Sequence, residues 1–600
     1  MILARQLQMN KNWTLNAQYD KTLTDKLATM LADGRCDADS SEFKTYSIIA
    51  QLLFQRGITD FDAARRYFSP QLSDLHSPFL MEDMHKAVER IEQALKQNEK
   101  ILVYGDYDVD GTCAVALVYS YLRQSCRQNV DFYIPNRYHE GYGVSLQSID
   151  WAFENGFSLI ISLDCGIKAA KQVEYARERG IDFIICDHHI PDDHIPNAYA
   201  ILDPKSPQCN YPFKELTGCG VGFKLVEALI RTRNEDIKEI NRYLDLVTLS
   251  IGADVVPITG ENRILAVYGL KQINTNPRPG LVALFSCANI MPAVYKKDGF
   301  FQKVLNMQDL LFSICPRLNA AGRMESGNTA VKALIADNST LASEIANDIN
   351  KCNDERRKFD RAVTKEALAI IEADKEIAER KSTVLYRPNW HKGVIGIVAS
   401  RVIEHYYKPT IIFTQSEDCL VGSARSISGF DIHSAVAQCA DLLEHFGGHK
   451  SAAGLTMKEE NLPQFVMRFE QAVTSIMQKE NMIDVADSLN VDVELSLNDI
   501  SERLMRLIKR FEPFGYQNME PLFATSRVVD TGSARTVGTN HLKLSVIHPH
   551  ISSQPYDAIG FTLGQKLPLI KNNEFDICYH LQENNYNGTK SLQLNIKDIR

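Results

Sequence analysis

Long apolar runs are missing from this sequence. No stretch of its 600 residues approaches the ~18 to 20 uninterrupted apolar residues of a membrane-spanning helix. The first residues, Met1 to Asp20, also lack an apolar segment followed by a small-residue cleavage site, so we expect no secretory signal. These two absences predict a protein with no membrane association.

Paired cysteines are missing as well. The 13 cysteines are scattered along the chain, odd in number and without any Cys-x-x-Cys pair. Such a distribution excludes both a disulfide framework and a zinc ribbon, and it is typical of a reducing compartment. We therefore expect the protein to be cytoplasmic.

An excess of basic residues is the third absence. Lysine and arginine number 66 against 75 aspartate and glutamate residues, which gives a net charge of −9 and a pI near 6.0. Nucleic-acid-binding proteins usually have a basic balance, so the net charge weighs against that class. A metal-dependent nuclease nevertheless needs many carboxylates at its centre and basic residues in one groove only. Net charge therefore does not decide the substrate.

The chain is too long for one hydrophobic core and contains no internal repeat. Its first hundred residues have a mainly helical pattern, whereas short apolar runs alternate with amphipathic helices from Lys100 onwards, which favours a parallel α/β sheet. A charged stretch without Gly or Pro after Gly327 predicts a long connecting helix, and a second α/β domain follows it. After Asn490 the sequence is β-rich, with turn signals typical of a small barrel. We expect an N-terminal helical lead at 1–75, a first α/β domain at 76–328, the connecting helix at 329–380, the second α/β domain at 381–480 and the barrel at 481–600.

Acidic residues gather at the ends of apolar segments in the first α/β domain. Ligands of parallel sheets bind beyond the carboxyl ends of the strands, so patches that follow strands should share one crevice. A single aspartate after a strand is more often a helix cap than a ligand, but three aspartates in five positions cannot all be caps. The patches are Asp106-Tyr107-Asp108-Val109-Asp110, Asp164-Cys165-Gly166, Asp187-His188-His189 and, after a helical run, Gly252-Ala253-Asp254.

Crowded carboxylates raise one another's pKa unless cations neutralise them. Oxygen ligands suit Mg²⁺ or Mn²⁺, and an added imidazole favours Mn²⁺. Two such ions can activate water and hold the oxygens of a phosphoryl group during its displacement. The acidic patches therefore predict a two-metal site for phosphoester hydrolysis.

Three later segments combine basic side chains with small residues, as anion-binding sites do. Guanidinium groups match phosphate oxygens in pairs, and small residues allow the backbone to approach an anion. For the first segment, a solvated loop is an equally good interpretation. In the second, Ser423 and Arg425 lie two apart on a predicted strand and share one face. The third is expected to be a tight loop after a helix from His433 to His445. The segments are Pro316 to Arg323, Gly422 to Ser426 and Phe446 to Gly454.

The four acidic patches, in this order, resemble the signature motifs of the DHH phosphoesterases. The flanking Ile134-Pro135-Asn136-Arg137 and Glu140-Gly141-Tyr142-Gly143 resemble the long exonuclease members rather than the smaller ones. Phe446 to Gly454 is similar to the Gly-Gly-His loop of the DHHA1 domain, and Trp390 to Gly396 to its opening. The resemblance covers essentially the whole chain and is looser after Asp484. It implies an α/β protein with a parallel-sheet DHH domain, a long helix, a smaller α/β DHHA1 domain and an OB-like β-barrel.

The resemblance also implies roles for single residues. Two Mn²⁺ or Mg²⁺ ions would be held by Asp108, Asp110, Asp164, His188 and Asp254. The catalytic groups would be five further residues. Asp106, Asp187 and His189 would lie behind the ligands or face the substrate. Arg323 would contact the DNA, and His449 would contact the scissile phosphate. Substrate contacts would come from Arg137, Asn319, Gly447 and Gly448, with Ser423 and Arg425 on a 5′-phosphate. Tyr104 stands where pyrophosphatase relatives have a metal-binding His, which argues against a pyrophosphatase and leaves one metal position open.

The implied function is a 5′→3′ exonuclease that hydrolyses single-stranded DNA in repair and recombination, with a helicase and a single-strand-binding protein as candidate partners. One alternative is a DHH phosphodiesterase of short oligoribonucleotides or small nucleotides. Those relatives are about half this length and lack the OB-like tail. Another is a non-catalytic DHH replication scaffold, in which the acidic ligands are eroded. The last hundred residues and the intact acidic motifs disfavour these two alternatives.

Overall fold

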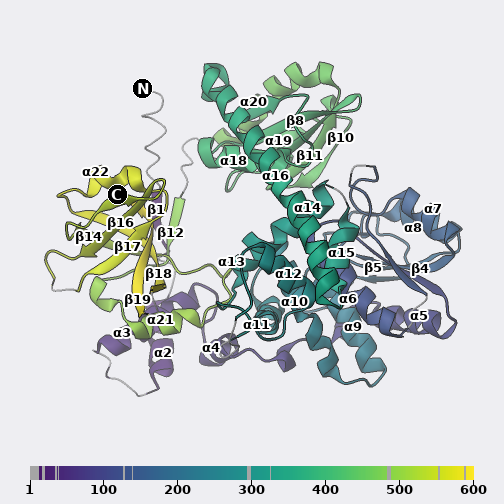
Figure 1. Cartoon of the computed structure of the whole chain (residues 1–600), viewed down its shortest axis with the longest axis horizontal. Coiled ribbons are helices and arrows are strands. Elements are labelled where there is room, and N and C mark those ends of the chain that lie inside the picture. Colours follow the sequence, from purple (N-terminus) through teal and green to yellow (C-terminus); the bar gives the residue numbers. More distant parts are fainter. Residues whose placement is uncertain are drawn as a thin grey trace. The chain divides into compact units, whose positions relative to one another are not determined.

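The computed structural model comprises two compact units, Trp13–Ile349 with Leu489–Arg600, and Asn350–Ser488 (Figure 1). Most of the segment from Met1 to Asp20, on which the expectation about a secretory signal rests, lies outside the described residues. None of the described helices combines the length and the apolar content that crossing a membrane requires. The described residues are 12–16, 20–33, 37, 40–125, 129–137, 139–293, 299–324, 326–480, 482, 488–551, 554–586 and 589–600.

A five-stranded parallel sheet forms the centre of the first unit, as the alternating pattern predicts. Ile101 and Val103 share a core with α5, α6 and α9, whereas Leu102 and Tyr104 share another with α7 and α8. Figure 1 shows these two groups of helices on opposite faces of the sheet. Helices therefore cover both faces, and every strand ends at the same edge. In sheet order the strands are β3 (Val130–Tyr133), β2 (Lys100–Gly105), β4 (Phe157–Leu163), β5 (Asp182–Cys186) and β6 (Ala200–Leu202). The helices are α5 (Met84–Lys96), α6 (Val109–Ser125), α7 (Leu146–Glu154), α8 (Ala170–Glu178) and α9 (Gly218–Thr232).

A largely helical segment continues the first unit. It adds α10 (Leu244–Ala253), α11 (Gly260–Thr275), α12 (Pro279–Cys287), α13 (Met307–Asp309), α14 (Cys315–Met324) and α15 (Gly327–Ile335). The predicted long connecting helix is present as α16 (Ser339–Ala373), but it does not fill 329–380, because this stretch also holds part of α15 and the separate α17 (Lys375–Glu379). Ala336 leaves the helical conformation at ψ 127°, and the Asn338 side chain accepts a hydrogen bond from the Leu341 amide to start the next helix. An asparagine that favours a helix start therefore divides the segment.

The second unit is a smaller α/β structure. Its sheet has the order β10-β11-β9-β8-β7, with β7 and β8 parallel and the other neighbours antiparallel. Phe413, Phe465 and Phe469 are among the buried residues of its core. The elements are β7 (Thr383–Tyr386), α18 (Ile395–Tyr406), β8 (Thr410–Ser416), β9 (Cys419–Arg425), α19 (Ile432–Ala437), β10 (His445–His449), β11 (Ala452–Met457) and α20 (Leu462–Lys479).

The C-terminal part of the first unit is a β-barrel, as its turn-rich sequence predicts. Pairing of β14 with β16 closes the order β14-β18-β19-β17-β16 into a ring, with β13 and β15 at its margins. Closure removes the exposed sheet edges. The elements are β12 (Ser488–Val491), β13 (Val493–Glu494), α21 (Glu502–Lys509), β14 (Phe523–Asp530), β15 (Arg535–Val537), β16 (His541–Ile547), β17 (Tyr556–Gly560), α22 (Leu567–Ile570), β18 (Phe575–Tyr586) and β19 (Thr589–Ile599).

The N-terminal helices share a core with this barrel, although almost the whole chain separates them. Leu27, Ile49 and Leu52 are buried in the same cluster as Phe511 and Phe523. The helical lead therefore packs as part of the C-terminal region and not as a separate layer. Its elements are β1 (Asn12–Leu15), which pairs with β12, and the helices α2 (Lys21–Ala32), α3 (Ser41–Phe54) and α4 (Phe61–Phe68).

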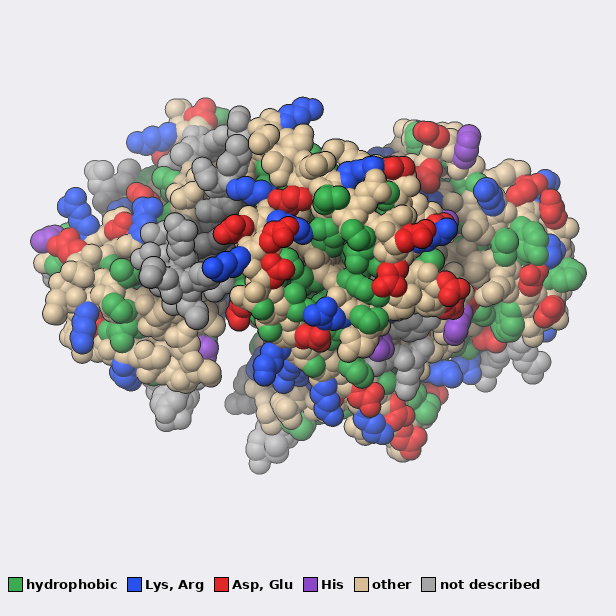
Figure 2. All heavy atoms as spheres, turned by 90° about the horizontal axis from the view of Figure 1, so that it is seen from above, with side chains coloured by type: hydrophobic (Ala, Val, Ile, Leu, Met, Phe, Trp, Pro, Cys, Tyr) green, Lys and Arg blue, Asp and Glu red, His purple; other side chains and the backbone are tan. Residues whose placement is uncertain are grey.

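Charged side chains of both signs are interspersed on the face seen in Figure 2. That distribution agrees with the moderate net charge of −9. A basic site for nucleic acid must therefore be local, and it has to be sought from the geometry of particular residues.

Candidate metal centre and phosphate-binding face

Three acidic patches follow β2, β4 and β5 at the shared carboxyl edge of the parallel sheet, as expected. Asp106 and Asp164 come directly after β2 and β4, and Asp187 directly after β5. Asp254 reaches the same place from the C-terminal end of α10. The strand order and the end of α10 together bring side chains as far apart in the sequence as Asp110 and Asp254 close to His188.

His188 is the point on which the carboxylates converge. Its Nε2 atom lies 3.1 Å from Asp164 Oδ1, 3.6 Å from Asp110 Oδ2 and 3.7 Å from Asp254 Oδ2. Ligand atoms of Asp110, His188 and Asp254 all lie within 4.8 Å of one another, and so do those of Asp164, His188 and His189. His188 belongs to both groups, which suits two neighbouring ion sites.

The local backbone fixes the positions of these candidate ligands. Asp164 has a left-handed φ of 60°, and a Cβ on Gly218 would approach Asp164 Cα to 2.7 Å, so α9 packs directly against this residue. Asp108 Oδ1 accepts a hydrogen bond from the Gly111 amide and caps the start of α6. A Cβ on Gly111 would meet the Asp106 carbonyl at 2.4 Å. Close backbone packing therefore fixes the turn that carries Asp106, Asp108 and Asp110.

Asp187 orients His189. One of its oxygens, Oδ1, accepts from His189 Nδ1 at 2.7 Å and from the His188 amide, while Oδ2 accepts from the Ile167 amide. Burial opposes ionisation of Asp187, but the hydrogen bond and charge of His189 outweigh it and hold the pKa of Asp187 below its usual range. Burial likewise disfavours the charged His189 ring, yet Asp187 raises its pKa. With Nδ1 occupied, His189 presents Nε2, which lies 3.3 Å from the Tyr142 hydroxyl.

Burial and mutual repulsion disfavour the charged form of the remaining carboxylates. Burial, followed by repulsion from neighbouring carboxylates, raises the pKa of Asp106, Asp108 and Asp164. Burial and the charge of Asp110 raise the pKa of Asp254 to about 8. Burial lowers the pKa of His188, so its imidazole remains neutral. A neutral imidazole among carboxylates that repel one another is a donor set ready for cations.

The donor set fits Mn²⁺ or Mg²⁺. Oxygen donors dominate, and a single central imidazole favours Mn²⁺. Neither carboxylate oxygen of the buried Asp106 accepts a well-formed hydrogen bond from the described residues, and the nearby Tyr107 and Gly143 amides only partly offset its burial. Buried anions without partners are costly, and cations would offset that cost. Asp108, Asp110, Asp164, His188 and Asp254 are all present in this one place.

Basic residues lie beside this centre. The Arg137 guanidinium stacks over the Tyr107 ring at 4.9 Å, and Arg323 acts on the same phenol electrostatically. The segment from Pro316 to Arg323 is the helix α14, so the interpretation as a loop is wrong. Gly322 allows that helix to approach, because a Cβ there would meet the Tyr107 carbonyl at 2.6 Å. Asn319 and Arg323 lie four residues apart and therefore share a helix face.

An anion-binding face occurs in the second unit. Ser423 and Arg425 alternate with buried residues along β9, and Arg425 Nη1 donates to Ser423 Oγ at 3.0 Å. Gly396, at the start of α18, lies so close that a Cβ would approach the Arg425 guanidinium to 2.7 Å. The amide-rich start of a helix, a guanidinium and a hydroxyl are groups with which proteins bind phosphate, so this face is a candidate phosphate site.

Gly447, Gly448 and His449 extend this face. They form the exposed strand β10 and not the predicted tight loop, and the expected long helix before them is only α19 followed by a short turn. Gly447 pairs with Gly454, which pairs with Ser423; His449 pairs with Ala452, which pairs with Arg425. Paired residues point to the same side of a sheet. His449, Ser423 and Arg425 therefore lie on the same face of the sheet as the small residues Gly447, Ala452 and Gly454.

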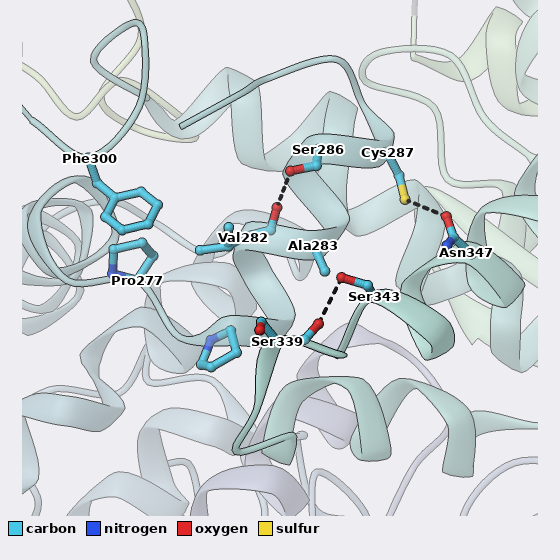
Figure 3. Close-up of a pocket in the computed structure, with 10 residues that line it drawn as sticks. Pro277, Val282, Ala283, Ser286, Cys287, Phe300, Ser339, Ser343 and Asn347 are labelled. Atoms are coloured by element: carbon cyan, nitrogen blue, oxygen red, sulfur yellow. Dashed lines mark hydrogen bonds between the residues drawn. The ribbon is translucent and has the colours of Figure 1, made fainter. Parts of the chain in front are cut away.

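A separate cavity of about 500 Å³ lies beside α12 and the start of α16 (Figure 3). Its hydroxyls already donate to carbonyls of their own helices, Ser286 to Val282 and Ser343 to Ser339, and the Cys287 thiol faces Asn347. None of the clustered carboxylates lines it. The chemistry of the molecule is therefore not in this cavity.

The structure adds residues that the motifs did not reveal. Asp203 follows β6 at the same sheet edge, and burial raises its pKa to about 7. The strand before Asp203 is only three residues long, so the sequence pattern did not single this residue out. An aspartate directly after an apolar strand was the signal that could have revealed it. Within the buried centre, the Ser250 hydroxyl donates to Asp110, and the Thr217 hydroxyl is hydrogen-bonded to Ser250. Tyr104 donates to the Gly143 carbonyl from within a hydrophobic cluster, so its hydroxyl is engaged.

Three family models match the chain. They are the DHH family N-terminal domain over residues 100–251, the DHHA1 domain over 380–475 and the RecJ OB domain over 491–598. The three matches follow the order of the parallel sheet, the smaller α/β unit and the closed barrel.

Individual relatives and a solved structure are similar to this chain over most of its length. The single-stranded-DNA-specific exonuclease RecJ of Bacillus subtilis is 36% identical over 92% of this chain and 67% of that protein. RecJ of Escherichia coli is 35% identical over 86% of this chain and 90% of that protein. The crystal structure of RecJ from Thermus thermophilus in complex with Mn²⁺ matches with a TM-score of 0.80 and 25% identity, covering 98% of this chain and 79% of that one.

Proposed function

This chain belongs to the RecJ family of single-stranded-DNA-specific exonucleases, and we propose that it hydrolyses terminal phosphodiester bonds of single-stranded DNA in the 5′→3′ direction. The observation that carries this proposal is the convergence of Asp110, Asp164 and Asp254 on His188 Nε2 at the sheet edge. Buried carboxylates with raised pKa values are expected where function requires them, because burial without a partner is costly.

The metal ligands we propose are Asp108, Asp110, Asp164, His188 and Asp254, holding two Mn²⁺ or Mg²⁺ ions. Such ions supply positive charge that polarises a phosphodiester and favours ionisation of water. The protein's own task is to keep the ligands deprotonated and correctly placed. Asp106 would stand behind them, next to Asp108 and within reach of the charge of Arg137.

His189 is the proton-handling group in this proposal. The Asp187 carboxylate accepts the proton of His189 Nδ1, so Nε2, next to the exposed Tyr142, is the ring atom that takes up or gives away a proton when His189 changes charge. Burial opposes the charged form of His189, but Asp187 raises its pKa and so favours the ring with protons on both nitrogens. A proton held at Nε2 would face the phosphate or the departing oxygen of the substrate.

The basic residues would hold the strand. Arg137, Asn319 and Arg323 border the carboxylate centre and would contact phosphates there. In the second unit, Ser423 and Arg425 would bind the 5′-phosphate, which makes the enzyme start from that end. His449, with Gly447 and Gly448 on the same strand, would contact the scissile phosphate.

Single-stranded substrate has to be generated from duplex DNA, so a helicase and a single-strand-binding protein are the partners we propose, in DNA repair and recombination. We assign the protein to the cytoplasm. Cys113, Cys219 and Cys315 are buried near one another in the DHH core and remain free thiols, which supports a reducing compartment.

Digestion of labelled DNA tests the proposal. Single-stranded DNA, duplex DNA and RNA, each labelled at either end, are incubated with Mn²⁺, Mg²⁺ or EDTA. We expect mononucleotides to be released from the 5′ end of single-stranded DNA only, and only with a divalent ion. Preferential cleavage of dinucleotides or short RNA would favour a small-nucleotide phosphodiesterase, and no cleavage at all would favour a scaffold.

A further inference from the structure

Asp110 is held by an unusually complete set of hydrogen-bond donors. Its Oδ2 atom accepts from the Gly218 amide at 2.7 Å, and its Oδ1 atom accepts from the Cys219 amide at 2.8 Å and from Ser250 Oγ at 2.7 Å. Asp110, Ser250 and Gly218 are all buried. The two amides belong to the start of α9, where the helix dipole also favours an anion.

A second hydroxyl fixes the direction of these bonds. Ser250 Oγ and Thr217 Oγ1 lie 2.5 Å apart, and Thr217 Oγ1 already accepts from the Gly220 amide. A hydroxyl has only one proton to donate. If Ser250 gives its proton to Asp110, Thr217 must give its own to Ser250. Every donor around Asp110 then points toward the carboxylate, which is the arrangement that suits an ionised ligand.

Ser250 also supports a second proposed ligand. Its backbone carbonyl accepts the Asp254 amide at 3.0 Å, at the end of α10. Side chain and backbone of one residue therefore fix two carboxylates that lie far apart in the sequence. Asp110 Oδ2, the oxygen with the single donor, is the one that lies 3.6 Å from His188 Nε2. Asp110 Oδ1, which has two donors, holds the side chain in place, and Asp110 Oδ2 is the oxygen that would bind the ion.

We propose that Ser250, supported by Thr217, is a positioning residue that tunes the affinity of the centre for its divalent ions. The inference rests on the proposed function, because it takes Asp110 and Asp254 as ligands. It assigns to a Ser–Thr pair outside the acidic motifs the task of holding the Asp110 carboxylate in one orientation. Partners behind the ligands typically change metal affinity by about 10 to 100-fold when removed.

The test measures Mn²⁺ binding to the full chain by calorimetry and by the EPR signal of free Mn²⁺, so no activity is needed. Ser250→Ala should bind Mn²⁺ about 10 to 100-fold more weakly than wild type. The matched control is Thr248→Val on the same helix, because the buried Thr248 hydroxyl donates to the Leu244 carbonyl and contacts no ligand. Its Mn²⁺ affinity should equal that of wild type.

Two outcomes separate this inference from the proposed function. If Ser250→Ala binds Mn²⁺ as tightly as wild type while Asp110→Ala loses binding, the positioning role is wrong and the metal site stands. If Asp110→Ala itself keeps full binding, the metal site is wrong. Should Ser250→Ala fail to fold, Thr217→Val against Thr217→Ser gives the same comparison: the valine variant must bind Mn²⁺ more weakly than the serine variant, and equal affinities overturn the inference.

Discussion

The carboxylate centre of the first unit and the anion-binding face of the second unit both present polar groups to a charged partner. They differ in burial: the first is buried and the second is exposed. Asp106, Asp110 and Asp187 are each only 1% exposed, and their charges are balanced by fixed donors or by the ions we propose. In contrast, Gly447, Gly448 and His449 lie on an exposed strand, where water is the alternative partner. A buried charge that loses its partner costs much free energy. An exposed contact contributes less, because water can replace it.

The two regions should therefore respond differently to substitution. In the buried centre, a change removes a ligand that nothing else replaces. On the exposed face, a change removes one contact of several, and water takes its place. Four experiments test this contrast.

The largest effect is expected in the buried centre. Asp164→Ala should abolish hydrolysis, because it removes a carboxylate 3.1 Å from His188 Nε2. The fold should persist, since the buried Asp164 carboxylate has a raised pKa and is itself unfavourable without a cation. Nuclease assays and circular-dichroism melting check the two statements, with the exposed Asp193→Ala as the matched control. Substantial activity in Asp164→Ala would contradict the expectation that substitutions in the buried centre have larger effects than those on the exposed face.

The next effect concerns the shared core of the first unit. Phe511 is fully buried and its ring contacts Tyr67 and Phe68 of the N-terminal helices. Phe511→Ala should lower the free energy of unfolding by about 3 to 5 kcal/mol, because it leaves a cavity between segments distant in sequence. Phe561→Ala is the control, because that ring is 52% exposed. Equal denaturant midpoints for the two variants would contradict a core shared by the N-terminal helices and the barrel.

Divalent ions should stabilise the first unit and leave the second unchanged. Mn²⁺ at about 100 times its dissociation constant should add about 2.7 kcal/mol per site to the free energy of unfolding. Thermal melting with Mn²⁺ and with EDTA measures this difference. Asp254→Asn should reduce the gain, whereas Arg425→Ala should keep it in full. A gain that disappears in Arg425→Ala would mean that the stabilising ions do not bind at the carboxylate centre.

The smallest effect is expected on the exposed face. Arg425→Ala should weaken the preference for 5′-phosphorylated ends by about 10 to 100-fold, because a charged hydrogen bond contributes about 1.5 to 3 kcal/mol. Competition between 5′-phosphate and 5′-hydroxyl strands measures it. The control is Arg468→Ala, whose guanidinium pairs with Asp441 on the surface of the same unit. Loss of activity on both kinds of end would instead place Arg425 at the reaction centre.

Much of the site could be predicted from the sequence because its residues follow strands in short motifs. Asp106 to Asp110, Asp164 and Asp187 to His189 each occupy a few consecutive positions after an apolar run, so periodicity and composition reveal them. Local errors arose where a segment could adopt two structures. The small residues of Pro316 to Arg323 fit a loop as well as α14, and Gly447 and Gly448 fit a turn as well as the strand β10.

The sequence by itself determined the chemistry of this protein: which carboxylates and imidazoles are present, and that successive parallel strands must bring them to one edge. Only the tertiary structure decided what surrounds them. Thr217, Ser250 and Asp203 carry no motif, since a hydroxyl or a lone aspartate acquires its role from a neighbour far away in the chain. The same holds for the core shared by Leu27 and Phe511. Contacts between distant segments depend on how whole helices and sheets pack, and no short stretch of sequence records that packing.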